Sequence, residues 1–354
     1  MPRRLPTSHL AATELIDFFK EALQLNAVQE GETVLVYGDS NTQPHYKAAF
    51  MGAAMGLGAN AVDMTVPTTS PAVQPWGKYS KQLGESLIAQ AWKAADLVID
   101  LTTGMGQLYG QVTTEALRSG TRVLRLTDPI DILRRNHPDP ENKRKALAAR
   151  EVMAPAKKIR FTSNAGTDLT MDKTGRPAAI QYGIADTPGH WDLWPAGQVA
   201  CAPIEGSAEG KLVINVGDIL LPLGRYVGDP ITCPVEGGRI VEIQGKGVDA
   251  FLLRDWFASW KDPNAYIVSH IGWGFLETAL WTRMTHKWEE TGGVMDAESF
   301  NGDVQIAFGN NLAFTLQGKN DTRAHIDIDC RDCSFYLDDQ LIVENGVIIP
   351  EALK

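Results

Sequence analysis

The chain has 354 residues, of which 44% are hydrophobic and 21% charged, and its formal net charge at pH 7 is −10. This composition is that of a folded globular protein long enough for two domains, so extensive disorder is excluded. The negative charge disfavours a nucleic acid or an anionic membrane as a partner, because either surface would repel the protein. A small neutral or polar substrate fits the composition.

The first residues, the apolar runs and the cysteines bear on the location of the protein. The segment Met1 to Pro6 lacks the apolar core of a signal peptide. No apolar run is long enough to cross a bilayer. The four cysteines are too few for a disulfide scaffold of this size. We therefore expect a cytoplasmic protein without membrane contact.

The first half of the chain alternates between strand-like and helical segments. Short apolar, β-branched runs predict strands at residues 33–37, 61–66, 96–101 and 122–126. Helical patterns are found at residues 8–29, 44–57, 81–94, 112–119 and 129–153. Buried strands that alternate with helices favour a mostly parallel sheet with right-handed crossovers. We predict a doubly wound α/β domain over residues 1–157.

Two loops of this domain lie where doubly wound sheets bind ligands, after a strand and before a helix. They are Gly38 to Thr42 and Gly104 to Gly110. Neither contains the Gly-x-Gly-x-x-Gly pattern of a dinucleotide site, because Tyr109 stands where the third glycine of the second loop would be. We interpret both as ordinary connecting loops.

After residue 157 the helical pattern gives way to short β-rich pieces broken by Gly, Pro and Asp. Helices are predicted only at residues 248–260 and at Glu277 to Met284. Strands are predicted at residues 159–162, 212–215, 219–221, 239–243, 304–308, 325–328 and 334–337. This pattern indicates a second, α+β and β-rich domain over residues 158–354, which would carry the metal site proposed next.

The segment Arg323 to Asp329 alternates polar and apolar residues, as a half-buried strand does. His325 and Asp327 therefore project from one face, and Ile326 and Ile328 from the other. An imidazole and a carboxylate on one wall are two of the three ligands of a two-histidine, one-carboxylate site. Such a site leaves positions on a ferrous ion for substrate and O2. A His-x-Asp pair on a strand also occurs as an ordinary hydrogen-bonded pair.

The best candidate for the second histidine ligand is His270, which ends an apolar run. Gly272 and Gly274 follow it and would let another chain segment or a ligand approach closely. Asp329 or Ser269 could hydrogen-bond to the outer ring nitrogens of the histidines.

His190 lies in a Pro- and Gly-framed segment, residues 188–195, together with Trp191 and Trp194. The two tryptophans could wall an aromatic pocket. Packing of the same segment against the core is an equally good interpretation.

With these residues in view, the chain resembles the 2,5-dihydroxypyridine 5,6-dioxygenases, which cleave a hydroxylated pyridine ring with a mononuclear non-haem iron. The resemblance covers nearly the whole chain. It is carried by residues 94–98, 119–122, 185–195, 207–210, 216–219, 253–255, 269–274 and 336–339. It implies Fe(II) as the cofactor and places the three iron ligands at His270, His325 and Asp327, the residues that the pattern selects.

The resemblance also implies the reaction and its partners. The expected reaction is extradiol-type opening, by O2, of the ring of a small hydroxylated N-heteroaromatic such as a dihydroxypyridine. The protein is expected to form a homo-oligomer. On this basis we expect His190, Gln181 and Tyr226 to be catalytic. We expect Trp191 and Trp194 to bind the substrate.

Three departures from the family pattern concern groups that transfer protons. Gln181 stands where a glutamate is expected, and an amide cannot act as a general base. Leu193 replaces a histidine between the two tryptophans, while His190 comes three positions earlier. A pocket histidine is also missing near residues 107–109. The ring that this chain opens therefore need not be the usual one.

A more distant resemblance is to metal-dependent aminopeptidases, which share a two-domain plan and a His…His-x-Asp arrangement. The alternative function is thus an aminopeptidase-like metallohydrolase on the same scaffold. Those enzymes bind two metals with additional glutamates and a tyrosine. Here Glu277 stands in the place of the tyrosine, and Arg254-Asp255 where Gly-Glu would be expected, so a two-metal hydrolase is disfavoured. A catalytically silent binding protein is a third alternative.

Overall fold

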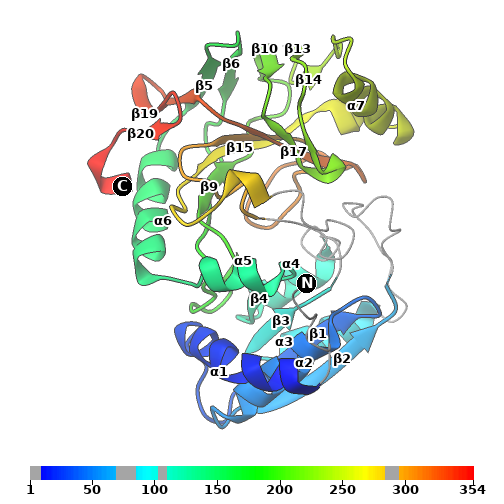
Figure 1. Ribbon diagram of the computed structural model, residues 1–354, viewed down its shortest axis with the longest axis vertical. Coiled ribbons are helices and arrows are strands. Elements are labelled where there is room, and N and C mark those ends of the chain that lie inside the picture. The colour runs from blue at the N-terminus through cyan, green and yellow to red at the C-terminus, as the bar shows by residue number, and fades with distance from the viewer. Residues whose placement is uncertain (1–8, 69–84, 103–109, 284–294) are drawn as a thin grey trace, which may run out of the picture.

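The computed structural model describes residues 9–68, 85–102, 110–283 and 295–354 (Figure 1). Its strands form one parallel sheet and two antiparallel sheets. In Figure 1 the parallel sheet and its helices occupy the lower part of the molecule, and the antiparallel sheets occupy the upper part. The predicted fold class, a parallel α/β sheet combined with a β-rich α+β part, is confirmed. No helix in the described ranges is long and apolar enough to span a membrane.

The parallel sheet has five strands and is flanked by helices. Its strand order is β2 (Asn60–Val66), β1 (Thr33–Asp39), β3 (Leu97–Asp100), β4 (Arg122–Arg125) and β8 (Trp191–Leu193). The helices of this region are α1 (His9–Leu25), α2 (Pro44–Met55), α3 (Glu85–Ala94), α4 (Gln111–Arg118) and α5 (Ile130–Arg135). Helix α6 (Pro140–Met153) instead packs against the core of the antiparallel sheets. Because β8 comes from beyond residue 157, the chain returns to its first sheet. The predicted division at residue 157 stays a prediction.

Two helix predictions were wrong. The helix expected over residues 129–153 is two helices, α5 and α6, since Pro138 and Pro140 interrupt the pattern and Asp139 caps α6. The helix expected from Glu277 onward is absent from residues 277–283, which end in a 3-10 turn at Trp281–Arg283. The backbone just before this segment bonds to a distant part of the chain, because the Leu276 amide donates to the Ser299 carbonyl at 2.8 Å.

The two antiparallel sheets enclose the largest hydrophobic core. The eight-stranded sheet has the order β14 (Arg239–Ile240), β13 (Ile231–Glu236), β10 (Glu209–Ile214), β6 (Asp168–Asp172), β5 (Lys158–Ser163), β18 (Cys333–Leu337), β19 (Gln340–Glu344) and β20 (Val347–Ile348). The seven-stranded sheet has the order β12 (Arg225–Tyr226), β11 (Ile219–Leu220), β17 (His325–Cys330), β16 (Val304–Gly309), β15 (Val268–Gly274), β9 (Gln198–Cys201) and β7 (Ala179–Gln181). Helix α7 (Val248–Ser259) packs against this core.

The seven-stranded sheet has one apolar and one polar face. Ile271, Ile306 and Ile328 alternate with polar residues along their strands and lie in the large core. The opposite face, here called the polar face, carries Gln181, Gln198, His270, Gln305, His325, Asp327 and Asp329. The period of two along each strand therefore separates the residues that stabilise the sheet from those available for chemistry.

A bulge in β15 determines where His270 points. Val268 and Ile271 both lie in the core although they are three residues apart, which strict alternation would not allow. The register of β15 against β16 shifts between them, as it does where a strand contains an extra residue. The bulge places both Ser269 and His270 on the polar side.

Gly272 is required for the close approach of β15 and β9. A Cβ atom at this position would lie 1.9 Å from the Val199 carbonyl oxygen. We predict that Gly272→Ala lowers the free energy of unfolding by about 3 kcal/mol, the cost of overpacking a tight site, as measured by denaturant titration. Gly228→Ala is the matched control, because its Cβ would meet nothing closer than 3.5 Å. Equal stability of the two variants would contradict the prediction.

Candidate metal centre

Three side chains of the polar face converge on one point. His270 comes from β15, while His325 and Asp327 come from β17. The Nε2 atom of His270 lies 3.2 Å from Asp327 Oδ1, and Nε2 of His325 lies 3.3 Å from Asp327 Oδ2. One ligand atom from each residue lies within 4.8 Å of the other two. No other group of three His, Cys, Asp or Glu side chains meets in this way within the described ranges.

The strand next to β17 approaches it closely at His325. In the antiparallel pair of β16 and β17, Ala307 lies opposite Asp327 and Gly309 lies opposite His325. A Cβ atom at position 309 would lie 2.2 Å from the Ala324 carbonyl oxygen, so only glycine allows this approach. The pairing with β16 thus helps to position His325 and Asp327 side by side.

The surroundings set the charge of Asp327 and His270. Burial alone would raise the pKa of Asp327, but the contacts with His325 and His270 outweigh burial and lower it below the ordinary range. Burial lowers the pKa of His270, so this ring is neutral at pH 7. An ionised carboxylate and neutral imidazole nitrogens are the forms that bind metal ions.

A backbone carbonyl orients the His325 ring. Nδ1 of His325 lies 2.9 Å from the Asn310 carbonyl oxygen, so the protonated Nδ1 donates and Nε2 faces Asp327. The Ser269 hydroxyl donates to the same carbonyl at 2.6 Å. The outer partner of His325 is therefore neither Asp329 nor the Ser269 side chain, the two candidates expected from the sequence. The oriented ring, together with a buried Asp327 Oδ1 that accepts no hydrogen bond although His270 Nε2 lies 3.2 Å away, fits a divalent transition metal.

Two further carboxyl groups on this side of the sheet have raised rather than lowered pKa values. Burial raises the pKa of Asp329 well above its ordinary range, and the negative charges of Glu298 and Asp303 raise it further. Burial likewise raises the pKa of Asp303, whose Oδ1 accepts a hydrogen bond from the Gly274 amide at 2.7 Å. The polar face thus combines one ionised aspartate with acids that burial keeps neutral.

A chain of side-chain amides crosses the polar face beside the three ligands. Gln305 donates to Gln198 Oε1, and Gln198 donates to Gln181 Oε1. Nε2 of Gln198 also donates to Glu298 Oε2 at 3.4 Å. Gln181 was predicted from the sequence as a site residue, but the side chains that bond to it or to its neighbour were not. Gln198, Gln305 and Glu298 were missed because their meeting depends on strand pairing over about a hundred residues.

The structure places the other predicted site residues as follows. Nε2 of His190 lies 3.0 Å from Asp192 Oδ2, and its ring stacks on Tyr182. The Tyr226 hydroxyl donates to the Trp281 carbonyl. None of these contacts involves His270, His325 or Asp327, and the catalytic roles expected for His190 and Tyr226 stay predictions.

The two tryptophans belong to the hydrophobic clusters around the parallel sheet. Trp194 lies against Phe18 and Phe19 of α1, and its indole nitrogen donates to the Asn136 carbonyl at 2.8 Å. Trp191 is buried in β8 within a separate cluster. Both pack as core residues, which was the second interpretation of their segment, and their role in substrate binding stays a prediction.

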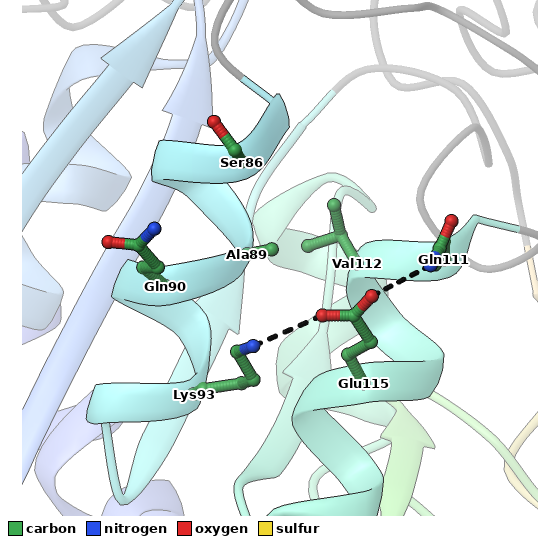
Figure 2. A pocket seen from close by; sticks show the side chains of 7 residues that line it. All are labelled: Ser86, Ala89, Gln90, Lys93, Gln111, Val112 and Glu115. Atoms are coloured by element: carbon green, nitrogen blue, oxygen red, sulfur yellow. Dashed lines mark hydrogen bonds and ion pairs between the residues drawn. The ribbon is translucent and has the colours of Figure 1, made fainter.

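A hollow of about 330 Å³ lies elsewhere, between α3 and α4 (Figure 2). Its charged groups pair with one another, since Glu115 lies 3.1 Å from Lys93 Nζ and accepts a hydrogen bond from Gln111 at 2.8 Å. The hollow contains none of the metal-centre residues, and nothing in its lining indicates a ligand. The loop at Gly104 to Tyr109, where a pocket histidine was found missing, lies outside the described residues.

The chain is similar to known proteins over almost its whole length. Residues 14–350 match the family 2,5-dihydroxypyridine 5,6-dioxygenase. The 2,5-dihydroxypyridine 5,6-dioxygenase of Pseudomonas putida is 35% identical, with 98% of this chain and 99% of the relative covered. The solved structure of the 2,5-dihydroxypyridine dioxygenase from Pseudomonas putida KT2440 has a TM-score of 0.91 at 34% identity and covers 97% of this chain and 99% of that one.

The distant resemblance is of fold alone. Wild-type AmpT from Thermus thermophilus has a TM-score of 0.58 at 14% identity, with 94% of this chain and 100% of that chain covered. The whole-chain matches at 34–35% identity confirm the family that the sequence resembles. The chain belongs to the 2,5-dihydroxypyridine 5,6-dioxygenase family.

Proposed function

We propose that the chain is an Fe(II)-dependent, extradiol-type dioxygenase that opens the ring of a small hydroxylated N-heteroaromatic such as a dihydroxypyridine. The observation that carries the proposal is the convergence of His270, His325 and Asp327 in a chain that belongs to this family. Two imidazoles and one carboxylate on one side of a metal form the facial arrangement typical of non-haem Fe(II) oxygenases.

The protein residues contribute charge, orientation and exclusion of water. Bound Fe(II) would supply open coordination positions for the ring oxygens and O2, and its charge would favour a deprotonated ring hydroxyl. Asp327 contributes the one negative charge of the ligand set, while the Asn310 carbonyl fixes the orientation of His325. The three ligands are buried, which keeps bulk water away from the reacting ring.

The metallohydrolase alternative is not favoured. Glu277, at the position of the expected tyrosine, is 66% exposed and pairs with Lys145. Arg254 lies on α7 and donates to the carbonyls of Ile243 and Gly245. These side chains therefore serve surface and helix contacts, and do not supply the additional ligands that a second metal would need. The homo-oligomer and the cytoplasmic location stay predictions.

Loss of either β17 ligand should weaken iron binding. We expect His325→Ala and Asp327→Asn each to lower Fe(II) affinity by more than about 100-fold, since even the outer partners of metal ligands are worth about 10–100-fold. Anaerobic reconstitution followed by chelator competition measures the effect. His45→Ala, a histidine on α2, is the control and should bind iron as the parent protein does. Unchanged affinity in Asp327→Asn would remove the assignment.

The reaction itself is tested by oxygen uptake. The anaerobically reconstituted protein should consume one O2 per molecule of at least one hydroxylated pyridine in a panel, with loss of the ring absorbance. Both atoms of O2 enter the product of a dioxygenase, so no external reductant is needed. A metallohydrolase would instead bind two metal ions per chain and hydrolyse peptides without oxygen. That second result would replace the proposal.

A further inference from the structure

Glu298 is an ionisable side chain near Asp327 that has no role in the metal-ligand set. It lies in the segment 295–300, which precedes β16. Gln181, at the other end of the amide chain, cannot ionise. Glu298 is therefore the only member of the group Gln181, Gln198, Gln305 and Glu298 that can exchange a proton with a substrate.

The hydrogen bonds of this group leave three polar atoms unpaired. Both N–H groups of the Gln198 amide are used, because Nε2 donates to Gln181 and Glu298, and Oε1 accepts from Gln305. Among the described residues, Nε2 of Gln181, Oε1 of Glu298 and the completely buried Oε1 of Gln305 have no hydrogen-bond partner. The two ends of the chain therefore present one donor group and one carboxyl oxygen that remain available to a ligand.

Contacts from both halves of the molecule hold Glu298 in place. Asp296, two residues earlier, accepts two hydrogen bonds from the Arg135 guanidinium of α5, at 2.5 and 2.8 Å. Ser299, the next residue, accepts a hydrogen bond from the Gly197 amide at 3.2 Å. The Glu298 carbonyl accepts from Gln305 Nε2 at 3.3 Å. The backbone at Glu298 is therefore held on both sides, which limits the positions that its side chain can take.

Exposure increases along the amide chain toward Gln181. Asp329 and Gln305 are completely buried, Glu298 and Gln198 retain 6% exposure, and Gln181 is half-buried. Glu298 lies beside this chain, where it is bonded to Gln198. Burial, with added repulsion from the Asp327 charge, raises the pKa of Glu298 well above its ordinary range, which favours the neutral acid.

We propose that Glu298 is a specificity-determining residue whose carboxyl group hydrogen-bonds to the ring-nitrogen edge of the substrate while the ring lies at His270, His325 and Asp327. This inference rests on the proposed function and names the part of the substrate that is recognised. A pyridine with an oxygen beside its ring nitrogen presents an N–H donor and a C=O acceptor side by side in its pyridone form. A carboxyl group complements both, and the Gln181 amide adds a donor.

The test compares a hydroxypyridine that has a free ring nitrogen with its N-methyl derivative. Methylation removes the donor but leaves the ring oxygens for the metal. The parent protein should prefer the free form by roughly 10-fold or more in kcat/KM and in anaerobic binding, because a site built to pair with a donor rejects an analogue that lacks it. Glu298→Leu should abolish this preference, because kcat/KM and affinity for the compound with the free ring nitrogen should fall.

Two controls separate recognition from a structural defect. A structural defect would lower activity with both compounds equally and would leave their ratio unchanged. Glu298→Gln keeps an acceptor oxygen for Gln198, so it should fold and bind iron, with a smaller preference than the parent. If Glu298→Leu does not fold, the preference measured for Glu298→Gln is the test of the inference. Asp303→Asn changes another buried acid, which is bonded to the Gly274 amide, and should leave the preference unchanged.

The outcomes distinguish this inference from the proposed function. If the parent protein consumes O2 with hydroxypyridines but both Glu298 variants keep its preference for the free ring nitrogen, the role of Glu298 is refuted and the proposed function stands. If the parent protein neither binds nor oxidises any hydroxypyridine, the proposed function fails and this inference fails with it. The inference is supported if the Glu298 variants lose the preference while Asp303→Asn keeps it.

Discussion

The seven-stranded sheet depends on the burial of one face, and the metal centre depends on that sheet. Ile271, Ile306 and Ile328 fix the register of β15, β16 and β17 because they must face the core. A shift of one residue in any of these strands would turn its polar residues inward. The hydrophobic effect at the core thus determines the positions of His325 and Asp327, although no core residue touches a metal. The bulge at Ser269 is the one local exception, and it brings His270 to the same side.

Burial of several acids on one side of a sheet also constrains the charge of the site. Asp327, Asp329, Asp303 and Glu298 cannot all be ionised in a low-dielectric region, because each added charge raises the pKa of the others. The two imidazoles select Asp327 as the ionised member. One carboxylate is therefore available to the proposed metal ion, while the neighbouring acids stay protonated. Environment rather than residue type separates these roles.

Much of this arrangement could be predicted from local patterns in the sequence. The alternation in residues 323–329 and the apolar run before His270 selected three side chains, and the structure brings these three together. Their role as metal ligands stays a prediction. The bulge was not predictable, since it reflects the fit of β15 to β16 rather than any residue of β15. The meeting of Gln198 with Gln305 was also hidden, because they are 107 residues apart and are joined only through the strand order β16, β15, β9. The expected helix after Glu277 failed for the same reason, as contacts with residues 299–300 outweighed local propensity.

The fold separates the metal ligands from the wall that a substrate would meet. The ligands lie on two strands whose positions follow from one core, so their geometry is over-determined. The wall is assembled from β7, β9 and the segment 295–300, and the last of these is tied to α5 by the Asp296–Arg135 pair. A change at residue 181 or 298 can therefore alter the charge and hydrogen bonding that a ring encounters without moving His270, His325 or Asp327. For this reason the glutamine at position 181 is compatible with an unaltered metal centre, and the recognition of the ring has to be sought in the group to which that glutamine is bonded.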